Sequence, residues 1–288
     1  MKGRSHPVDI LYGHTPFNFR VEEAVRSAIR IHLHEPSGDI LVFLTGSEEC
    51  ELATRLTYQK LQDLLDEGKE VPTCLIYSLY GAQSSEDQAR VFEKVDTDIR
   101  KIIYSTNIAE TSITIDGIGF VIDCGHVKQK QYNPKTGMDR LVIVPISKVQ
   151  AIQRAGRAGR TQAGRCYRMY SEKFYKEQMS KTTIPEILRV NLCSLILTLK
   201  CIGVDDVLNF DYMEKPDDDL ILRALRQLYM LDALKRDGAL TNFGRELVKY
   251  PIEPHFSKAL MISKYLDCQD ALLTVSLKVL FGGFWCDI

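Results

Sequence analysis

The first 170 residues alternate between short apolar runs and longer stretches in which apolar positions recur with helical spacing. The clearest apolar run is Asp-Ile-Leu-Val-Phe-Leu-Thr at 39–45, and a helical pattern over 19–34 precedes it. Further strands are expected at 72–78, 100–106, 120–124 and 164–170, and further helices at 48–66, 85–95 and 148–158. This strand–helix alternation predicts an α/β fold with a doubly wound, mainly parallel sheet that is covered on both faces.

Helical patterns dominate beyond about residue 171. They cover 184–202, 220–234, 242–250 and the chain from His255 onward, whereas 234–241 is typical of a small turn or wing between two helices. We therefore expect an α/β domain over 8–171 and a mostly helical domain over 172–251. The remaining stretch, 252–288, predicts the start of a helical bundle, and its apolar end at 281–288 indicates that this element is incomplete.

The composition is that of an ordinary globular protein, because 45% of the 288 residues are hydrophobic and 26% are charged. A collagen, a coiled-coil rod and a largely disordered chain are excluded. The sequence has no run of about 18 apolar residues and no apolar amino-terminal segment, so an intracellular protein without a membrane partner is expected. Its eight cysteines include no Cys-x-x-Cys pair, which predicts free, mostly buried thiols and no metal site.

The formal net charge of −1 hides an uneven distribution of charge. Residues 100–170 hold twelve Lys or Arg and four Asp or Glu, while the rest of the chain is net acidic. A basic middle between acidic flanks indicates a binding site rather than a device for solubility.

The strongest chemical signal is Gln-Arg-Ala-Gly-Arg-Ala-Gly-Arg at 153–160. A helix through this stretch, at about 100° per residue, places Gln153, Arg157 and Arg160 within roughly 60° on one face, and Arg154 outside it. Its two glycines cost about 1 kcal/mol each in a helix interior, which indicates the close approach of another backbone or of a ligand. Two guanidinium groups and an amide on one stripe suit a polyphosphate, with a solvated basic helix face as the plainer alternative.

A second signal is Ser-Thr-Asn-Ile-Ala-Glu-Thr-Ser-Ile-Thr-Ile-Asp-Gly-Ile at 105–118. It follows an expected strand, and doubly wound sheets bind their ligands at the carboxyl ends of strands. Short hydroxyl groups and an amide there can bind phosphate oxygens or sugar hydroxyls. An ordinary Ser/Thr turn is the alternative.

These two stretches together resemble motifs V and VI of superfamily-two helicases, and specifically of the DEAH-box RNA helicase family. Residues 39–49 resemble the motif IV of that family, and 77–81 with 88–92 resemble the stretch that follows it. Further matches at 123–125, 128–130, 145–148 and 185–189 extend the resemblance over nearly the whole chain. The motifs are long and stand in the family's order, which makes the resemblance specific.

The resemblance implies a RecA-like fold for 8–171, as the second of two such domains. It implies a winged-helix domain for 172–251 and the start of a ratchet-type domain for 252–288. In the family, ATP binds between the two RecA-like domains, and RNA lies across both. Arg157 and Arg160 would then be arginine fingers on the γ-phosphate, and Gln153 would face the phosphates.

Other site residues follow from the same resemblance. On the nucleotide, Phe92 would stack on the adenine, Asp116 would contact the ribose side, and Ser112 would lie near the phosphates or the attacking water. From the residues alone, Phe92 could equally be a core aromatic. The residues expected to hold the RNA backbone are Thr45, Gly46, Tyr80, Gly81, Thr106 and Asn107.

The sequence also departs from the pattern of the family. Ala82-Gln83 stands where Leu-Pro is usual, and His126 stands where Phe is common. We expect the second of these departures to change only the local packing. The chain contains no Gly-x-x-x-x-Gly-Lys-Ser/Thr phosphate loop and no Asp-Glu-x-His. In the family both belong to the first RecA-like domain, where the ligands of the Mg²⁺ that accompanies ATP are expected. We therefore interpret the chain as the carboxyl-side part of a helicase, a fragment or a short form.

The leading interpretation is thus a part of an ATP-dependent RNA helicase, a hydrolase that acts on RNA or ribonucleoproteins and is inactive by itself. By resemblance the nucleus is the favoured compartment, and a G-patch-type activator or ribonucleoprotein components stay open as partners. A non-catalytic module that binds RNA or protein partners is the alternative. A dinucleotide-binding oxidoreductase fits the sheet, but the sequence lacks the Gly-x-Gly-x-x-Gly turn that it needs.

Overall fold

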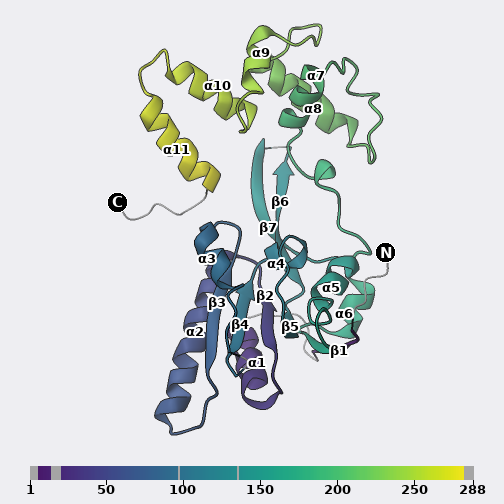
Figure 1. Ribbon diagram of the computed structural model, residues 1–288. Helices are drawn as coiled ribbons and strands as arrows, with labels where there is room; N and C mark the ends of the chain where they lie inside the picture. Colours follow the sequence, from purple (N-terminus) through teal and green to yellow (C-terminus); the bar gives the residue numbers. More distant parts are fainter. Residues whose placement is uncertain (1–5, 14–20, 97, 135, 282–288) are drawn as a thin grey trace. The chain divides into compact units, whose positions relative to one another are not determined.

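The computed structural model describes residues 6–13, 21–96, 98–134 and 136–281, with side chains up to residue 275. Within them, 6–129 and 142–183 form one compact unit, here called the α/β unit (Figure 1). Residues 130–141 and 184–281 form the other, here called the helical unit. The division into domains at 171 and 251 stays a prediction.

The α/β unit is built on a six-stranded sheet in the order β1-β8-β5-β2-β4-β3, and all neighbouring strands are parallel (Figure 1). The predicted parallel sheet is therefore confirmed. Its strands are β1 (Val8–Tyr12), β2 (Asp39–Phe43), β3 (Cys74–Leu79), β4 (Arg100–Ser105), β5 (Ile118–Asp123) and β8 (Gly164–Arg168).

Two hydrophobic clusters cover the two faces of this sheet. Because successive side chains of a strand point to opposite faces, β2 sends Ile40 and Val42 into one cluster and Leu41 and Phe43 into the other. The first cluster includes residues of α1 and α2, and the second includes residues of α4 and α5. The helices of the unit are α1 (Val21–His34), α2 (Ser47–Asp66), α3 (Ser85–Arg90), α4 (Ile108–Thr111), α5 (Lys148–Ala155) and α6 (Glu172–Glu177).

Helix α5 begins with a capping box but ends earlier than the sequence predicted. The Ser147 side chain accepts a hydrogen bond from the backbone N–H of Gln150, whose own side chain bonds the N–H of Ser147. The helix ends at Ala155, and tighter turns follow it, such as the 3.1 Å bond from the Arg157 N–H to the Arg154 carbonyl. The single helix face predicted for Gln153, Arg157 and Arg160 is therefore wrong.

The close backbone approach that the two glycines predicted is confirmed at Gly159. A Cβ atom there would lie 2.6 Å from the carbonyl oxygen of His6, whose N–H donates to the Gly159 carbonyl at 2.8 Å. This contact pins the turn after α5 to the segment that enters β1.

Replacing Gly159 by Ala is expected to destabilise the chain by about 1–3 kcal/mol, because backbone atoms cannot yield to the added methyl group. Urea unfolding followed by circular dichroism measures this change. Gly81→Ala is the matched control, because a Cβ at Gly81 meets no atom within 4 Å. Equal stability of the two variants would contradict the packing described here.

The sequence analysis did not anticipate a hairpin formed by β6 (His126–Asn133) and β7 (Met138–Pro145). Its tip belongs to the helical unit, where Arg189 donates to the Lys130 carbonyl at 2.8 Å and accepts from the N–H of Tyr132 at 2.8 Å. The turn residues Asn133-Pro134 and Gly137, between two extended runs, are the signal that could have predicted it.

The helical unit has one hydrophobic cluster, to which α7, α8 and α9 contribute. The helix predicted over 184–202 is interrupted, because a short 3₁₀ turn (η1) is followed by non-helical residues before α7. Leu234 pairs with Leu240 in an antiparallel bridge, where the sequence predicted a wing. Its elements are η1 (Glu186–Leu188), α7 (Cys193–Cys201), α8 (Asp218–Met230), α9 (Asn242–Leu247), α10 (Pro254–Ser263) and α11 (Gln269–Phe281).

The incomplete last element was predicted on the apolar end over 281–288, and all of it except Phe281, the last residue of α11, lies outside the described residues. None of the described helices combines the length and the apolar character that crossing a membrane requires. The described residues also include no group of three His, Cys, Asp or Glu side chains placed to hold a metal ion.

Candidate functional site

The three pairs of residues predicted to hold RNA lie along one edge of the sheet, at the carboxyl ends of its strands. Strands β2, β4 and β3 are neighbours, and Ser105 is in register with both Phe43 and Leu79. Each strand therefore ends at the same level, and each pair follows one of these strand ends. The pairs are Thr45 and Gly46 after β2, Thr106 and Asn107 after β4, and Tyr80 and Gly81 after β3.

These residues differ in what they offer to a ligand. Gly81 and Asn107 are exposed and Thr106 is half-buried. The side chain of Tyr80 is buried, and its hydroxyl donates to the Glu51 carboxylate at 3.0 Å. Burial and this hydrogen bond raise the pKa of Tyr80 to about 12. Tyr80 therefore shapes the turn, whereas Gly81 and Asn107 are the residues most open to a ligand.

The end of β2 has two features that suit an anion. The buried hydroxyl of Thr45 has no hydrogen-bond partner among the residues that the structure describes, although the backbone N–H of this residue donates to Glu49 at 2.8 Å. The ammonium group of Lys128 lies over Gly46, since a Cβ there would be 2.8 Å from its nitrogen. Lys128 forms no ion pair with the described residues. The sequence analysis had placed Lys128 only within a matching stretch.

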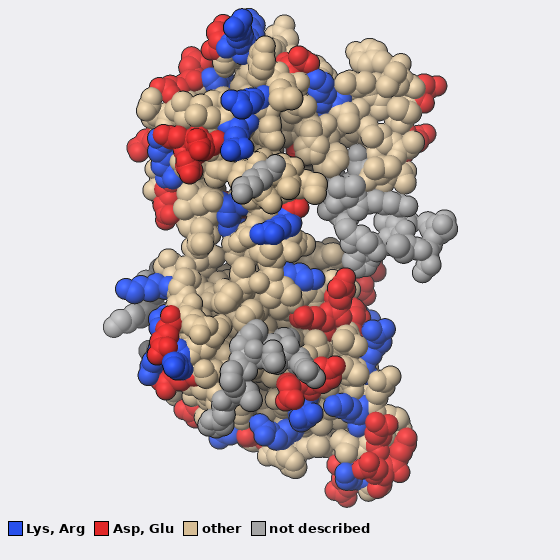
Figure 2. Space-filling view, turned by 180° about the vertical axis from the view of Figure 1, so that it is seen from behind, with Lys and Arg blue, Asp and Glu red and all other residues tan. Residues whose placement is uncertain are grey.

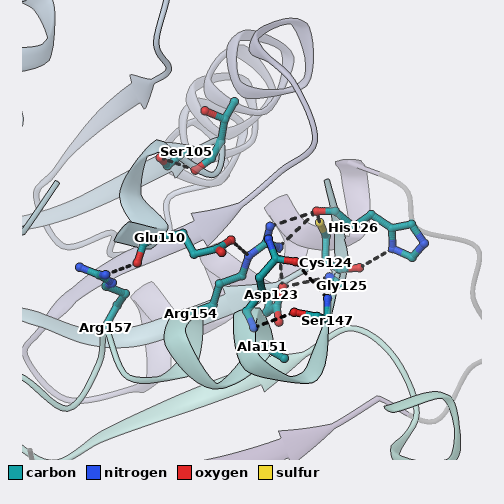
Figure 3. Close-up of polar contacts among 12 residues, drawn as sticks. Ser105, Glu110, Asp123, Cys124, Gly125, His126, Ser147, Ala151, Arg154 and Arg157 are labelled. Atoms are coloured by element: carbon teal, nitrogen blue, oxygen red, sulfur yellow. Dashed lines mark hydrogen bonds and ion pairs between the residues drawn. The ribbon is translucent and has the colours of Figure 1, made fainter. Parts of the chain in front are cut away.

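Arg154 forms a fully buried ionic network that the sequence analysis missed (Figure 3). Its guanidinium donates to Glu110 at 3.0 Å and to Asp123 at 2.9 Å, and both of its terminal nitrogens donate to the His126 carbonyl at 3.2 Å. It also lies over the Phe43 ring, 4.8 Å from the centroid. Burial alone would lower the pKa of Arg154, but the nearby carboxylates raise it above its ordinary value.

This network joins four separate elements, because its members come from α4, β5 and α5 and from the first residue of β6. Asp123 carries a further bond, since the hydroxyl of Tyr170 donates to it at 2.9 Å. The sequence contains a pattern that could have predicted the burial of Arg154. It shares the buried side of α5 with Ala151 and Ala155, whereas the neighbouring Gln153 is exposed.

Arg157 and Arg160 both bind the segment 110–114, which begins in α4 and leads towards β5. Arg157 is only 8% exposed and donates to the backbone carbonyls of Glu110 and, at 3.2 Å, Ile113. Arg160 is exposed and donates to the Thr114 hydroxyl at 2.7 Å. Burial and the charge of Arg160 lower the pKa of Arg157. The two guanidinium groups are thus held on neighbouring acceptors, although they do not share a helix face.

Unlike Arg154, neither of these two arginines forms an ion pair with the residues that the structure describes. Their acceptors are carbonyl and hydroxyl oxygens, which carry no net charge. Two positive charges therefore stand near each other without a salt bridge among the described residues, although the Glu110 carboxylate, which is paired with Arg154, still attracts Arg157. Such a pair can bind an anionic group, and phosphate oxygens match the fork of donors on a guanidinium.

The residues expected to contact the nucleotide lie together on one face of the sheet. Ser112 and Asp116 are exposed; Ser112 lies among the acceptors of Arg157 and Arg160 in the chain and Asp116 follows them. Phe92 is 44% exposed. The chain neighbours Val91, Ile115 and Ala158 belong to one hydrophobic cluster, which brings these segments together. The exposure of Phe92 argues against the alternative of a core aromatic.

The charge of residues 100–170 suggested an exposed basic surface, but several of these basic side chains are buried or bound to other parts of the chain. Arg100 donates to carbonyls at the end of α1, including that of Ile31 at 2.9 Å, and Lys101 donates to the Val91 carbonyl at 2.9 Å. Arg154 and Arg168 are also buried. Lys and Arg are accordingly interspersed with Asp and Glu on the face drawn in Figure 2. Among the described residues, only part of the positive charge of this stretch is therefore open to a ligand.

The two departures from the family pattern have structural accounts. Gln83 ties the turn after β3, because it accepts from the N–H of Tyr80 at 3.0 Å and donates to the Ser78 carbonyl at 3.0 Å. His126 is buried and stacks on Phe174 with ring centroids 6.1 Å apart, and burial lowers its pKa. Both residues stabilise local structure.

Comparisons with known proteins give consistent results. Residues 22–162 match the helicase conserved C-terminal domain family, and residues 224–252 match the helicase associated domain (HA2), winged-helix. The Schizosaccharomyces pombe protein "Pre-mRNA-splicing factor ATP-dependent RNA helicase prp22" is 44% identical over 283 residues, which are 98% of this chain and 24% of the relative.

Two solved structures have the same fold. The Escherichia coli DEAH/RHA helicase HrpB superposes with a TM-score of 0.82 at 30% identity, over 99% of this chain and 35% of that chain. A second structure, described as the E. coli DExH-box NTPase HrpB, gives a TM-score of 0.77 at 29% identity, over 98% of this chain and 34% of that chain. The chain thus spans a quarter to a third of the length of these relatives.

Proposed function

Because the chain belongs to the DEAH-box RNA helicase family, as its carboxyl-side part, we propose that it serves in ATP-dependent remodelling of RNA or ribonucleoproteins. Residues 8–171 would act as the second RecA-like domain, 172–251 as the winged-helix domain, and 252–288 as the start of the ratchet-type domain. The name of the S. pombe relative supports RNA processing in the nucleus as the setting. A G-patch-type activator or ribonucleoprotein components would be its protein partners.

The observation that carries this proposal is the contrast among the three arginines of 153–160. Arg154 is neutralised by two buried carboxylates, whereas Arg157 and Arg160 are held without one. This difference supports a structural role for Arg154 and a role at the γ-phosphate for the other two, and Gln153 would face the phosphates as well. Arginine fingers stabilise the negative charge that develops on phosphate oxygens during phosphoryl transfer.

The nucleotide would meet this domain along the exposed segment between α4 and β5. Phe92 offers a ring face to the adenine, and Asp116 and Ser112 offer oxygens to the ribose side and to the phosphate end. Two uncompensated guanidinium groups fit the triphosphate of ATP. The ligands of Mg²⁺ would come from a phosphate-loop domain, as the resemblance to the family implies.

The segment 106–116 would couple the two sites. It begins with Thr106 and Asn107 at the edge proposed for RNA, and it continues to the oxygen acceptors of Arg157 and Arg160. A displacement of either arginine by bound phosphate would therefore be transmitted through α4 to the RNA contacts. Closure of the RecA-like domains around ATP would in this way change the grip on the RNA backbone.

Binding of the 288-residue chain to single-stranded RNA tests this proposal. We expect measurable affinity at low salt that falls by about tenfold or more between roughly 50 and 200 mM salt, because phosphate contacts release counterions. Lys128→Ala and Asn107→Ala should each weaken binding, whereas Lys69→Ala, an exposed lysine paired with Glu67, should not. Affinity that is equal in all three variants would contradict the proposed RNA edge.

The chain by itself is expected to have negligible ATPase activity, because the family's phosphate loop and its Asp-Glu-x-His are absent from the sequence. A phosphate-release assay with saturating RNA measures it. Turnover that disappears in Arg157→Ala would show that these 288 residues hold a complete active site. If the chain binds RNA but does not change the ATPase rate of a phosphate-loop domain added to it, the non-catalytic alternative would be favoured.

A further inference from the structure

A pocket of about 310 Å³ lies in the helical unit, where the turn of the hairpin meets the start of α7, the end of α8 and the start of α10. We call it the hairpin pocket. Its volume is at the lower end of the range for sites that bind small ligands, so it suits one compact molecule. It is separate from the residues proposed above for ATP and RNA, all of which lie in the α/β unit. Its lining residues are Gly137, Asn191, Cys193, Gln227, Met230, Leu231, Pro254 and His255.

Most of the wall of the hairpin pocket suits a flat ring. Met230 and Leu231 lie three and four positions after Gln227, so these three residues share one face at the end of α8. Pro254 is buried, whereas Met230 and His255 are exposed and form the outer part of the wall. Thioether and imidazole side chains both pack well on flat aromatic rings. The pocket therefore offers a planar ligand an apolar floor and two side chains on which it can stack.

Two carboxamides are polar groups of the pocket that keep hydrogen-bonding capacity. The thiol of Cys193 donates to the side-chain oxygen of Gln227 at 2.8 Å, and the side-chain nitrogen of Gln227 donates to the Tyr132 hydroxyl at 3.3 Å. Because an amide oxygen accepts two hydrogen bonds and an amide nitrogen donates two, Gln227 retains one of each. Asn191 uses only its oxygen among the described residues, since it accepts from the N–H of Cys193 at 2.8 Å.

The thiol of Cys193 fixes the orientation of the Gln227 amide. Burial raises the pKa of Cys193 to about 12, so the thiol stays protonated and continues to donate at neutral pH. The oxygen of Gln227 therefore faces Cys193, and its nitrogen faces Tyr132 and Gly137, where a Cβ would lie 3.8 Å from that nitrogen. A side chain held in this way presents its remaining donor and acceptor in fixed positions.

The charge of the lining excludes one class of ligand, and its carboxamides exclude another. Lys, Arg, Asp and Glu are absent from the described lining residues, so a phosphate group finds no cation there. Glu253, beside Pro254 in the chain, is paired with Lys130 at 3.2 Å, and Lys130 also pairs with Asp139 at 2.8 Å. A plain phenyl ring would leave the carboxamides without partners, which costs affinity. The lining thus selects a neutral, planar ligand that has both hydrogen-bond donors and acceptors.

We propose that the hairpin pocket binds a single adenine base. The oxygen of Gln227 accepts from the exocyclic amine of adenine, and its nitrogen donates to N7, which is the bidentate pairing of carboxamides with this base. The ring packs on Met230 and His255, and the amide nitrogen of Asn191 donates to a second ring nitrogen. Such a base comes from a free nucleoside or from an unstacked nucleotide of RNA. The site does not rest on the proposed function, because adenosine carries no phosphate and the pocket lies outside the α/β unit.

Nuclear magnetic resonance of the 288-residue chain with isotope-labelled methionine methyl groups tests this proposal, and Met230→Leu identifies the signal of Met230. Adenosine should shift that signal saturably, with a Kd of about 0.1–1 mM for a ligand of this size. The signal of Met213, which is fully exposed and does not line the pocket, should stay in place. Purine riboside, which lacks the exocyclic amine, should bind about tenfold more weakly.

Gln227→Leu should lower the affinity for adenosine by about tenfold or more, because it removes the bidentate pairing. Gln62→Leu on α2 is the control, since Gln62 is exposed and does not line the pocket. Circular dichroism melting checks the fold of both variants. If Gln227→Leu does not fold, the comparison of adenosine with purine riboside on the unmodified chain still decides.

An unmoved Met230 signal, or equal affinity for adenosine and purine riboside, overturns the proposal. An equal shift with p-cresol, which represents a tyrosine side chain, overturns it in favour of a protein ligand. A short oligoadenylate distinguishes the two sources of the base. If it shifts Met230 at a lower concentration than adenosine does, and oligouridylate does not, the site binds a base of RNA. If adenosine alone shifts Met230, the site binds a free nucleoside.

Discussion

Arg157→Ala and Arg160→Ala are each expected to lower the rate of ATP hydrolysis by about a thousandfold once a phosphate-loop RecA-like domain is supplied. Both guanidinium groups are held by uncharged acceptors on 110–114, so they are free to bind a phosphate without first breaking an ion pair. Steady-state phosphate release at saturating RNA measures kcat. RNA affinity should change little, because neither arginine lies at the strand-end edge.

Arg26→Ala is the matched control, since this exposed arginine of α1 pairs, among the described residues, with Glu23 of the same helix alone. Its kcat should equal that of the unmodified protein. Arg157→Lys separates charge from geometry, because a lysine keeps the charge but loses the planar fork of donors. A kcat within a few-fold of the unmodified value in both alanine variants would remove these residues from catalysis.

Arg154→Met is expected to lower the free energy of unfolding by about 3–5 kcal/mol, because it leaves Glu110 and Asp123 as buried carboxylates without a counter-charge. Urea unfolding followed by circular dichroism measures the loss. Neutralising the two carboxylates in the same chain, with Glu110→Gln and Asp123→Asn, should recover part of it. The recovery is the signature of an ionic network rather than of a lost packing contact.

Lys249→Met provides the surface comparison. Lys249 and Glu246 form an exposed pair, so this change should stay within about 0.5 kcal/mol. A loss from Arg154→Met that is no larger than this would show that the buried network does not hold α4, α5 and β5 together. In that case the contrast between Arg154 and the two neighbouring arginines would lose its basis.

Arg154, Arg157 and Arg160 show how far helical periodicity predicts the positions of side chains. The angle of about 100° per residue correctly separated Arg154 from Gln153, because both lie within the helix that ends at Ala155. The same angle failed for Arg157 and Arg160, which lie in the turns beyond that end. What brings these two together is their shared binding to the segment between α4 and β5, a contact across more than forty positions of the chain.

The hairpin formed by β6 and β7 was missed for a related reason. Its strands are mostly half-buried or exposed, so they lack the continuous apolar runs that marked the central strands. Their position is decided by partners elsewhere in the chain, such as Arg189 and Gln227. Turn residues between two extended runs were the only local signal.

The sequence by itself determined the parallel α/β sheet, the start of α5, the wing between Leu234 and Leu240, and the motifs that carry the resemblance to the helicase family. These features depend on local periodicity and on residues that are close in the chain, and such patterns can be read without coordinates. Only the tertiary structure decided which basic residues of 100–170 are buried and which stay open. Burial and ion pairing depend on contacts between distant segments, and those contacts separate the structural Arg154 from Arg157 and Arg160.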